Sequence, residues 1–311
     1  MSTTQERLDI EPAPAAGHEK HRSLGSDVWR QFRRHKGAIT GLVLMAIIVI
    51  AVFAGPVLWS GDGTTPNTPN ANQTPSWEHP MGTDNIGRDV MARVFMGGRI
   101  SLAVGVTAMV VSITLGTTVG VLSGFFRKLD GPLMRLTDLF LALPVLPLLL
   151  VVMMLFREPL TKTFGLRAGI FILVVGIIGA TSWMTTARVV RGQVLTVKEK
   201  EFVLAANSIG TRKRNIVFRH ILPNVLSPVM VAAALGVASA IITESALSFL
   251  GLGFPPDFPT WGRLLFDAKD YLPTNPWRVI WPGVMISLTV ISVNFVGDGL
   301  RDALDPKLRS K

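Results

Sequence analysis

The sequence predicts an all-α polytopic membrane protein with six transmembrane helices. At 311 residues, with 49% apolar residues and a mean hydropathy of +0.42, the chain is too apolar for one soluble domain. Charge-free or nearly charge-free runs occur at 39–59, 100–126, 139–156, 168–187, 221–243 and 279–297. At a rise of about 1.5 Å per residue, even a run of 18 residues reaches roughly 27 Å, close to the hydrocarbon thickness of a bilayer.

Basic residues are distributed unevenly between the two sides of these spans. Twenty-two of the 31 Lys and Arg residues lie in the N-terminal tail, the loops 123–138 and 188–220 and the C-terminal end, and nine lie in the other three loops. Because positive residues concentrate on the cytoplasmic side, we expect a multi-pass protein of the cell membrane with both termini in the cytoplasm. The net charge of +10 then reflects topology. Basic residues that flank spans do not favour nucleic-acid binding.

The chain begins with a predicted cytoplasmic tail, residues 1–37. Its first 25 residues are polar and lack an apolar period, which predicts disorder. Trp29 and Phe32, with basic neighbours, are interpreted as an interfacial anchor for the first transmembrane helix at 38–60. An extracytoplasmic segment, 61–99, follows, and its Pro-, Asn- and Thr-rich start predicts a linker without a fold of its own.

Residues 79–102, HPMGTDNIGRDVMARVFMGGRISL, form a turn-rich entry into the second span. A metal site built from His79, Asp84 and Asp89 is conceivable, because these side chain types are common ligands. Acids in such loops more commonly cap helices, and nothing in the spacing fixes a ligand geometry. We therefore expect no metal site in this chain.

Glycines and prolines within the spans predict how the helices pack. Gly116, Gly120 and Gly124 recur every four residues in the second span and predict a flat face for close helix contact. In the third span, Pro144 and Pro147 predict a bend. Membrane helices tolerate such a bend where neighbouring groups satisfy the freed carbonyls.

The fifth span carries the one acidic residue that lies well inside an apolar segment, Glu244. Such residues usually face protein or water. Together with Ser239, Thr243 and Ser248, Glu244 is therefore a candidate for lining a translocation path. The alternative is a structural hydrogen bond from Glu244 to a neighbouring helix near the outer boundary, and both interpretations stay open.

A polar, basic insert separates the fourth and fifth spans at Glu201–Asn224, EFVLAANSIGTRKRNIVFRHILPN. It predicts a short helix with an apolar stripe at i, i+3, i+4 and i+7, formed by Phe202, Ala205, Ala206 and Ile209. Gly210 is expected to end this helix in a left-handed conformation, and Pro223 to mark the next segment. The two alanines would let a partner approach the helix backbone, although the same pattern is typical of a helix lying on lipid headgroups.

This insert resembles the cytoplasmic coupling loop of ABC importer membrane subunits, the motif EAA…G…IxLP. Aligning Gly210 with the motif glycine brings four more residues into register, Ala205, Ala206, Leu222 and Pro223. Leu204 stands where the acid is usual and His220 where the isoleucine is, and Glu201 is a candidate for the missing charge. The resemblance implies coupling to ATPase subunits through Glu201, Phe202, Ala205, Ala206, Ile209, Gly210, Leu222 and Pro223.

Further blocks resemble the C-type membrane subunits of dipeptide and oligopeptide importers. These blocks are residues 79–102, residues 246–262 (ALSFLGLGFPPDFPTWG) and residues 294–308 (NFVGDGLRDALDPKL). In the outer loop, Trp261, Phe254 and Phe258 are expected either to contact a binding protein or to anchor the loop at the interface. The likeness covers residues 30–309 and implies a type I ABC importer permease fold with a cytoplasmic coupling helix.

The same resemblance divides the chain after the first span. It implies a five-helix permease core at 100–300, which includes the cytoplasmic coupling loop 188–223 and the outer loop 250–280. A cytoplasmic C-terminal end, 301–311, follows.

Energy for transport is expected to come from other chains. The dipeptide Gly-Lys does not occur, so the chain lacks a nucleotide-binding loop and is not expected to be an enzyme or to bind a cofactor. The resemblance implies a homologous permease subunit, two ABC ATPase subunits that carry ATP and magnesium, and an extracytoplasmic solute-binding protein. With the second permease subunit, the chain would form the path for di- or oligopeptides across the lipid bilayer.

Three alternatives remain open from the sequence. An importer of nickel or another small solute from the same family would look nearly identical. A secondary transporter would need coupling-ion sites at the membrane midplane, for which one glutamate near a membrane edge is weak support. A stand-alone membrane scaffold would leave the docking helix unexplained.

Overall fold

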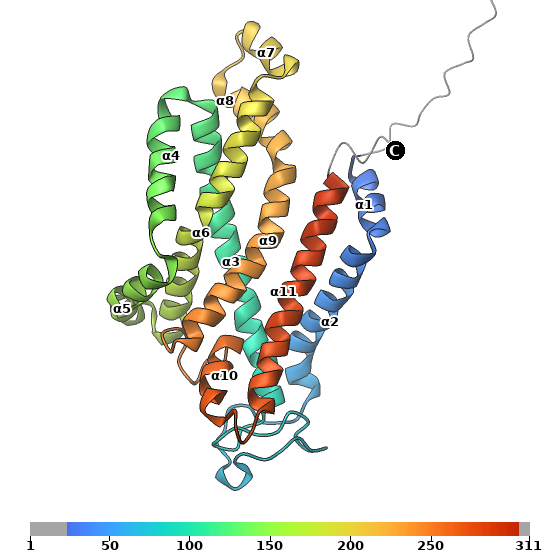
Figure 1. The fold of residues 1–311 in the computed structure, drawn as a ribbon, viewed down its shortest axis with the longest axis vertical. Coiled ribbons are helices and arrows are strands. Elements are labelled where there is room, and N and C mark those ends of the chain that lie inside the picture. Colours follow the sequence, from blue (N-terminus) through green and yellow to red (C-terminus); the bar gives the residue numbers. More distant parts are fainter. Residues whose placement is uncertain (1–23, 305–311) are drawn as a thin grey trace, which may run out of the picture.

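The computed structural model describes residues 24–304, and helices form almost all of it (Figure 1). Within that range the only β-type pairing is an isolated bridge between Thr83 and Asp89. The α-helices are α1 (Leu24–Arg34), α2 (Lys36–Leu58), α3 (Val90–Phe125), α4 (Arg127–Ala142), α5 (Val145–Phe164), α6 (Leu166–Lys198), α7 (Glu201–Ser208), α8 (Lys213–Ile216), α9 (Leu222–Phe249), α10 (Trp261–Ala268) and α11 (Trp277–Leu304). Shorter turns are two 3₁₀ helices, Thr68–Asn70 and Lys269–Tyr271, and a π-helical turn, Val217–Ile221.

Five helical stretches of the described chain are long and apolar enough to cross a bilayer. They are α2, α3, α6, the continuous run from α8 to α9, and α11. A sixth crossing is reached when α4 and α5, which meet at an angle of 89°, are taken as one broken span. The prediction of an all-α polytopic membrane fold is confirmed, and the described residues contain five such spans, or the predicted six if the bent pair counts as one.

The predicted third span, 139–156, lies across this bend and is therefore not one helix. α4 ends at Ala142, and α5 begins at Val145 after an extended Leu143 and Pro144. The ring of Pro144 disfavours helical geometry at Leu143, so the chain turns there. Pro147 lies in the first turn of α5, where its missing N–H costs no helical hydrogen bond.

The close contact predicted for the second span is made between α3 and α6. A β-carbon added at Gly116 would come within 2.7 Å of the Thr186 side chain. One at Gly120 would lie 2.7 Å from the carbonyl oxygen of Ala187, and one at Gly124 would meet α6 equally closely. The two backbones approach to a distance that only glycine allows, which confirms the predicted packing face.

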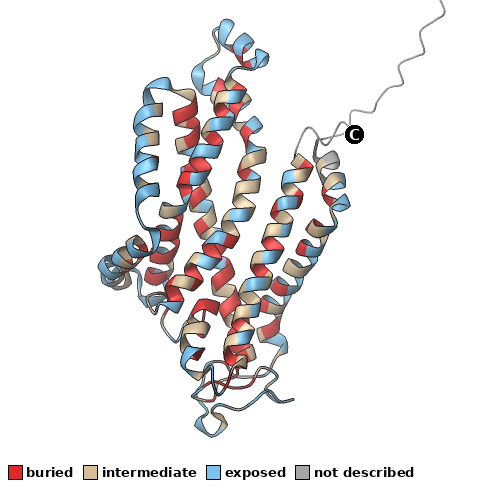
Figure 2. Ribbon diagram, in the orientation of Figure 1, coloured by how far each residue is buried: buried red, intermediate tan, exposed pale blue. Residues whose placement is uncertain are grey.

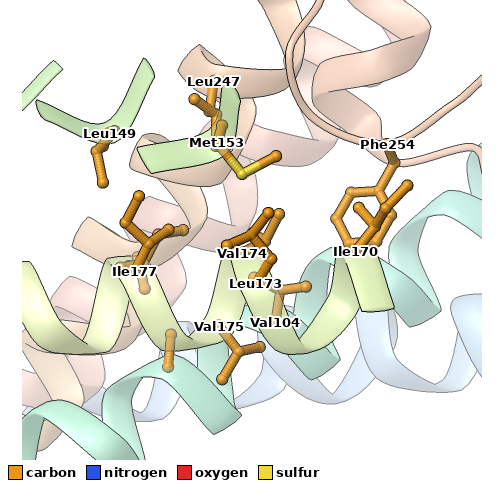
Figure 3. Packing of buried hydrophobic residues seen from close by; sticks show 13 residues of the cluster. Val104, Leu149, Met153, Ile170, Leu173, Val174, Val175, Ile177, Leu247 and Phe254 are labelled. Atoms are coloured by element: carbon orange, nitrogen blue, oxygen red, sulfur yellow. The ribbon is translucent and has the colours of Figure 1, made fainter. Parts of the chain in front are cut away.

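α5 packs against this helix pair through an apolar cluster (Figure 3). Leu149 and Met153 of α5 are fully buried among Ile170 and Val174 of α6 and Val104 of α3. The outward face of α4 is exposed (Figure 2), as expected for a surface that meets lipid or another subunit.

The segment between α2 and α3 is folded, so the prediction of a linker without structure is wrong. The Asn67 amide donates to the Ile86 carbonyl (2.8 Å), and the Asn72 amide donates to the Asp84 carbonyl (2.9 Å). The Thr83 hydroxyl accepts a further hydrogen bond from a backbone amide of the same linker, at 2.8 Å. These hydrogen bonds join residues that lie well apart in the sequence, so local composition does not reveal them.

Helices extend beyond several predicted boundaries. Residues 90–99 of the predicted segment 61–99 belong to α3, and residues 188–198 of the predicted coupling loop 188–223 belong to α6. Part of the predicted outer loop 250–280 forms α10. Apolar runs mark only the part of each helix that is free of charge, so they underestimate helices whose ends carry polar residues.

The predicted N-terminal tail contains a helix, α1, whose Phe32 is buried against α11 with Ala38 and Ala303. Phe32 is therefore a packing residue, whereas Trp29 remains exposed. The disorder predicted for the first 25 residues falls almost wholly outside the described residues.

α1, α7 and the end of α11 lie at one end of the molecule, and the segment between α2 and α3 lies at the other end with α10 (Figure 1).

Candidate functional site

α7 ends in a hydrogen-bonded glycine cap. Gly210 has φ +76° and its amide donates to the Asn207 carbonyl (3.0 Å), while the Thr211 amide donates to the Ala206 carbonyl (3.1 Å). These two bonds form the Schellman motif, in which a left-handed residue satisfies the last carbonyls of a helix. The predicted conformation of Gly210 is confirmed. A β-carbon there would meet no atom within 4 Å, so backbone geometry alone favours glycine.

The apolar residues of α7 divide between two faces, which corrects the predicted stripe. Ala206 is 7% exposed and packs inward with Val203, which is buried as well. Phe202 and Ala205 are exposed, and Ile209 is 82% exposed. Because α7 has one face against the bundle, the chain uses part of its own apolar pattern to hold the helix in place. Of the predicted stripe, Phe202, Ala205 and Ile209 therefore remain exposed.

The inward face of α7 rests on an apolar cluster that joins the loop to the ends of α3, α6 and α9. Besides Val203 and Ala206, its buried members are Val121, Val190, Val194, Val197, Ile216, Ile221, Val225 and Val229. Close-packed interiors transmit displacement because they resist compression. A movement of α7 would therefore pass directly to α6 and α9.

The helix after the loop begins at Lys213 and not at the predicted Pro223. α8, the π turn and α9 form one continuous helical stretch of 37 residues, Lys213–Phe249. Pro223 has no amide hydrogen, and the Leu222 amide donates to the Val217 carbonyl five residues back. The wider π turn accommodates the proline without breaking the helix. Leu222 and Pro223 thus lie inside the helix that connects the loop to the membrane span.

A cavity of about 1370 Å³ lies between α3, α6 and α9 on one side and α1, α2 and α11 on the other. Hydroxyl and amide side chains line its first side, namely Ser112, Ser182, Thr185, Thr186, Gln193, Thr196, Asn224, Ser227 and Ser239. Of the four predicted path residues, Ser239 lines this cavity, and Thr243, Glu244 and Ser248 do not. The sequence does carry a signal for it, because the polar residues of α6 recur at helical spacing from Ser182 to Thr196.

Glu244 is fully buried and its carboxylate is satisfied by hydroxyl groups from two helices. Ser248 Oγ donates to Oε1 (2.7 Å), and Ser101 Oγ of α3 donates to Oε2 (3.2 Å). Ser101 Oγ in turn accepts a hydrogen bond from the Trp261 amide (3.2 Å) at the start of α10. The geometry agrees with the alternative given from the sequence, a structural bond to a neighbouring helix.

The aromatic residues of the outer loop pack inward. Trp261 is fully buried and its indole N–H donates to the Val94 carbonyl (3.0 Å), and Phe254 is buried as well. The prediction that they contact a binding protein or an interface is therefore wrong for these two. Phe258 is partly buried, with the Arg167 guanidinium 4.4 Å from its ring centroid.

The three residues considered as metal ligands have other contacts. Asp89 caps the first turn of α3, and its Oδ2 lies 2.8 Å from His79 Nδ1. Asp84 forms ion pairs with Arg88 and Arg93, each at 2.7 Å. Burial raises the pKa of Asp84, but hydrogen bonds and charge from Arg88, and the charge of Arg93, outweigh burial and lower the pKa from its ordinary value. Within residues 24–304, no group of three His, Cys, Asp or Glu residues could hold a metal ion.

Apolar spanning helices with a large cavity between them, one wall of which carries hydroxyl and amide groups, are typical of a membrane transport subunit. Residues 112–310 match the family described as binding-protein-dependent transport system inner membrane component. Residues 23–75 match the N-terminal TM domain of oligopeptide transport permease C. The chain belongs to the family of binding-protein-dependent transport system inner membrane components, and its relatives are named as permease proteins of transport systems.

Several curated relatives match nearly the whole chain. It is 38% identical over 292 residues to the oligopeptide transport system permease protein OppC of Bacillus subtilis, covering 94% of this chain and 92% of the relative. It is 37% identical over 316 residues to the dipeptide transport system permease protein DppC of Alkalihalophilus pseudofirmus, covering all of both. It is 40% identical over 291 residues to OppC of Haemophilus influenzae, covering 93% and 90%. The family resemblance inferred from the sequence is confirmed.

Replacing Glu244 with Ala should lower the melting temperature and yield of the purified protein. The Ser101 and Ser248 hydroxyls would lose their acceptor, at a cost of roughly 1–3 kcal/mol. Thr243→Val is a control, because the Thr243 hydroxyl bonds only to the Ser239 carbonyl of its own helix. Glu244→Gln should keep transport per folded complex unchanged. Normal stability of Glu244→Ala combined with altered transport would instead place Glu244 on the path.

Proposed function

We propose that this chain is one of two membrane subunits of an ATP-driven importer for di- or oligopeptides. The observation that carries the proposal is its 37–40% identity, across at least 90% of each relative, to permeases named for oligopeptides and dipeptides. The polar wall of the large cavity supports it, because hydroxyl and amide groups can replace part of the hydration of a peptide.

A homologous permease subunit would complete this path. At the cavity, α9 leaves Leu226 and Met230 exposed one helical turn apart, and these apolar side chains need either lipid or another helix against them. A second, related permease subunit would supply apolar helices that can pack against these side chains. Ser239 and the polar face of α6 would then line the shared path, and Thr243 stays a candidate beside it.

The ATPase subunits would dock on the exposed face of α7, formed by Phe202, Ala205 and Ile209. They would carry ATP and magnesium, while this chain binds no cofactor. Closing of the ATPase pair would move α7, and the apolar cluster beneath it would pass the movement to α6 and α9 as a rigid-body rearrangement. An extracytoplasmic binding protein would deliver peptide at the opposite end, near α10.

Reconstitution of the whole complex into liposomes tests this proposal. We expect uptake of a labelled di- or oligopeptide that requires ATP and the solute-binding protein. ATP-dependent uptake of nickel without peptide uptake would assign the complex to another solute. Uptake driven by an ion gradient without ATP would identify a secondary transporter and contradict the proposal.

Labelling of single cysteines should show that α7 faces the cytoplasm. The chain has no natural cysteine, so Trp77→Cys, Asp270→Cys and Ser208→Cys each provide one reactive site. Trp77 is 100% exposed, and its end of the molecule is opposite to α7 (Figure 1). Positions 77 and 270 should react with an impermeant reagent in intact cells, and position 208 only after lysis. The reverse pattern would contradict the proposed orientation.

Ala205→Asp should abolish peptide uptake and loosen the ATPase subunits while the protein stays folded. Ala205 lies on the exposed face of α7, so the new carboxylate is hydrated in the free chain and desolvated only at the docked interface. Ala206→Asp is the matched contrast, because it buries the charge within the chain and should lower the melting temperature as well.

Gly210→Val should lower the free energy of unfolding by about 1–2 kcal/mol, because a β-branched residue is strained in the left-handed backbone conformation of this position. Gly210→Asn should have a milder effect.

Copurification of the ATPase subunits and ATP-dependent peptide uptake measure these effects. Gly210→Val is expected to retain the subunits but to hydrolyse ATP without transport, because the helix direction changes and its docking face does not. Normal uptake in both Ala205→Asp and Gly210→Val would show that the loop does not transmit energy.

A further inference from the structure

A second cavity, of about 650 Å³, lies at the same end of the molecule, on the side of α7 that is turned toward α3 and α4. The corner between α3 and α4, the end of α6, and residues of α7 and α8 surround it. We call this cavity the basic groove. It is separate from the large cavity between α9 and α11 and from the proposed docking face of Phe202, Ala205 and Ile209, none of which lines it.

Positive charge dominates the basic groove. Its lining contains four cations, Arg127, Lys128, Lys198 and Lys213, and one carboxylate, Glu199. Among the described residues, none of the four cations forms an ion pair. The neighbouring acid of α4, Asp130, is instead bound by Arg191 through two hydrogen bonds of 2.5 and 2.7 Å. In the part of the chain that the structure describes, no carboxylate therefore lies within ion-pairing distance of these four side chains, and only the charge of Lys198 acts on Asp130 from further away.

The first turn of α4 adds to this positive potential. Its residues Arg127, Lys128 and Leu129 line the groove, and the residue before them, Phe126, provides no side-chain cap. The unpaired backbone N–H groups of a helix start carry partial positive charge. Together with the four side chains they favour an anion with several acceptor oxygens, of which a phosphate group is the common biological example.

The rest of the lining is apolar. Phe125, Phe126, Leu129, Val203, Leu204 and Ile216 contribute this surface. Phe125 is the last residue of a membrane-spanning helix, so the groove lies at the end of the spans. A free inorganic anion would leave the apolar surface exposed to water, whereas a lipid covers it with its glycerol and upper acyl chains.

We propose that the basic groove binds the phosphate headgroup of an anionic phospholipid from the leaflet at the α7 end. Basic pockets between membrane helices bind such headgroups through charge, and the apolar lining here accommodates the attached chains. The bound phosphate would bridge α4, α6 and α8 and would steady the inner face of α7. The inference depends on the membrane location of this family and not on which solute is transported.

The test uses the full chain, with the subunits that copurify with it, in nanodiscs of phosphatidylcholine with or without phosphatidylglycerol. Native mass spectrometry and titration with fluorescent phosphatidylglycerol measure retention and affinity. Lys128→Gln combined with Lys213→Gln should weaken phosphatidylglycerol binding about 10- to 30-fold, given the usual contribution of each basic residue near an anionic surface. Lys162→Gln with Lys269→Gln removes the same charge at the opposite end and should leave this binding unchanged.

Leu204→Glu provides an independent test, because it places a carboxylate in the groove without removing a cation. It should reduce phosphatidylglycerol binding by a similar factor, while Leu204→Gln should not.

Equal binding of phosphatidylcholine and phosphatidylglycerol by the unmodified protein would overturn the proposal. Competition by inorganic phosphate as effective as that by the lipid would assign the groove to a free anion instead. Loss of the ATPase subunits from the double variant with unchanged lipid binding would assign the cations to a protein partner.

Discussion

The bundle depends on the close contact that glycine allows between α3 and α6. Gly116, Gly120 and Gly124 bring the two backbones together, and α5 then packs on the pair. The same contact continues toward α7, where Val121 of α3 joins Val194 of α6 in the cluster under the loop. A side chain at any of the three glycines would therefore separate the helices that carry both the large cavity and the docking loop.

The opposite end of the molecule is held by buried polar groups. Arg93 is 2% exposed, pairs with Asp84 and donates to the Pro256 carbonyl (3.1 Å). Deeper in the bundle, Ser101 and Glu244 connect α3 to α9 and to the start of α10. Removing one partner of a buried pair leaves an uncompensated group, so these contacts hold this end of the molecule together as one block. The end near α7 has partly exposed ion pairs such as Asp130–Arg191, but its buried contacts are mainly apolar, and apolar packing is less directional and allows helices to shift against one another.

Features that depend on neighbours in the sequence could be predicted from it. The glycine face of α3, the left-handed Gly210 and the bend at Pro144 each follow from a few adjacent residues. The sequence could not reveal contacts between distant segments, such as the Glu244 bond to Ser101, 143 residues away, or the burial of Trp261 against α3. The stripe on α7 lies between these cases. Its period predicted the helix, but the ends of α6 and α9 decide which of its residues face inward.

α7 and its C-cap residue Ile209 consequently present two chemically different surfaces. Ala205 and Ile209 face outward, whereas Leu204 and Asn207 line the basic groove. Glu201, considered from the sequence as a substitute for an acid at position 204, lies in the first turn of α7 and does not line the groove. An acid in the first turn stabilises the helix through its dipole and does not neutralise the cations around Leu204. Leucine at position 204 therefore leaves the basic groove positively charged, and the proposed ATPase contact and the proposed lipid site lie on opposite faces of one short helix.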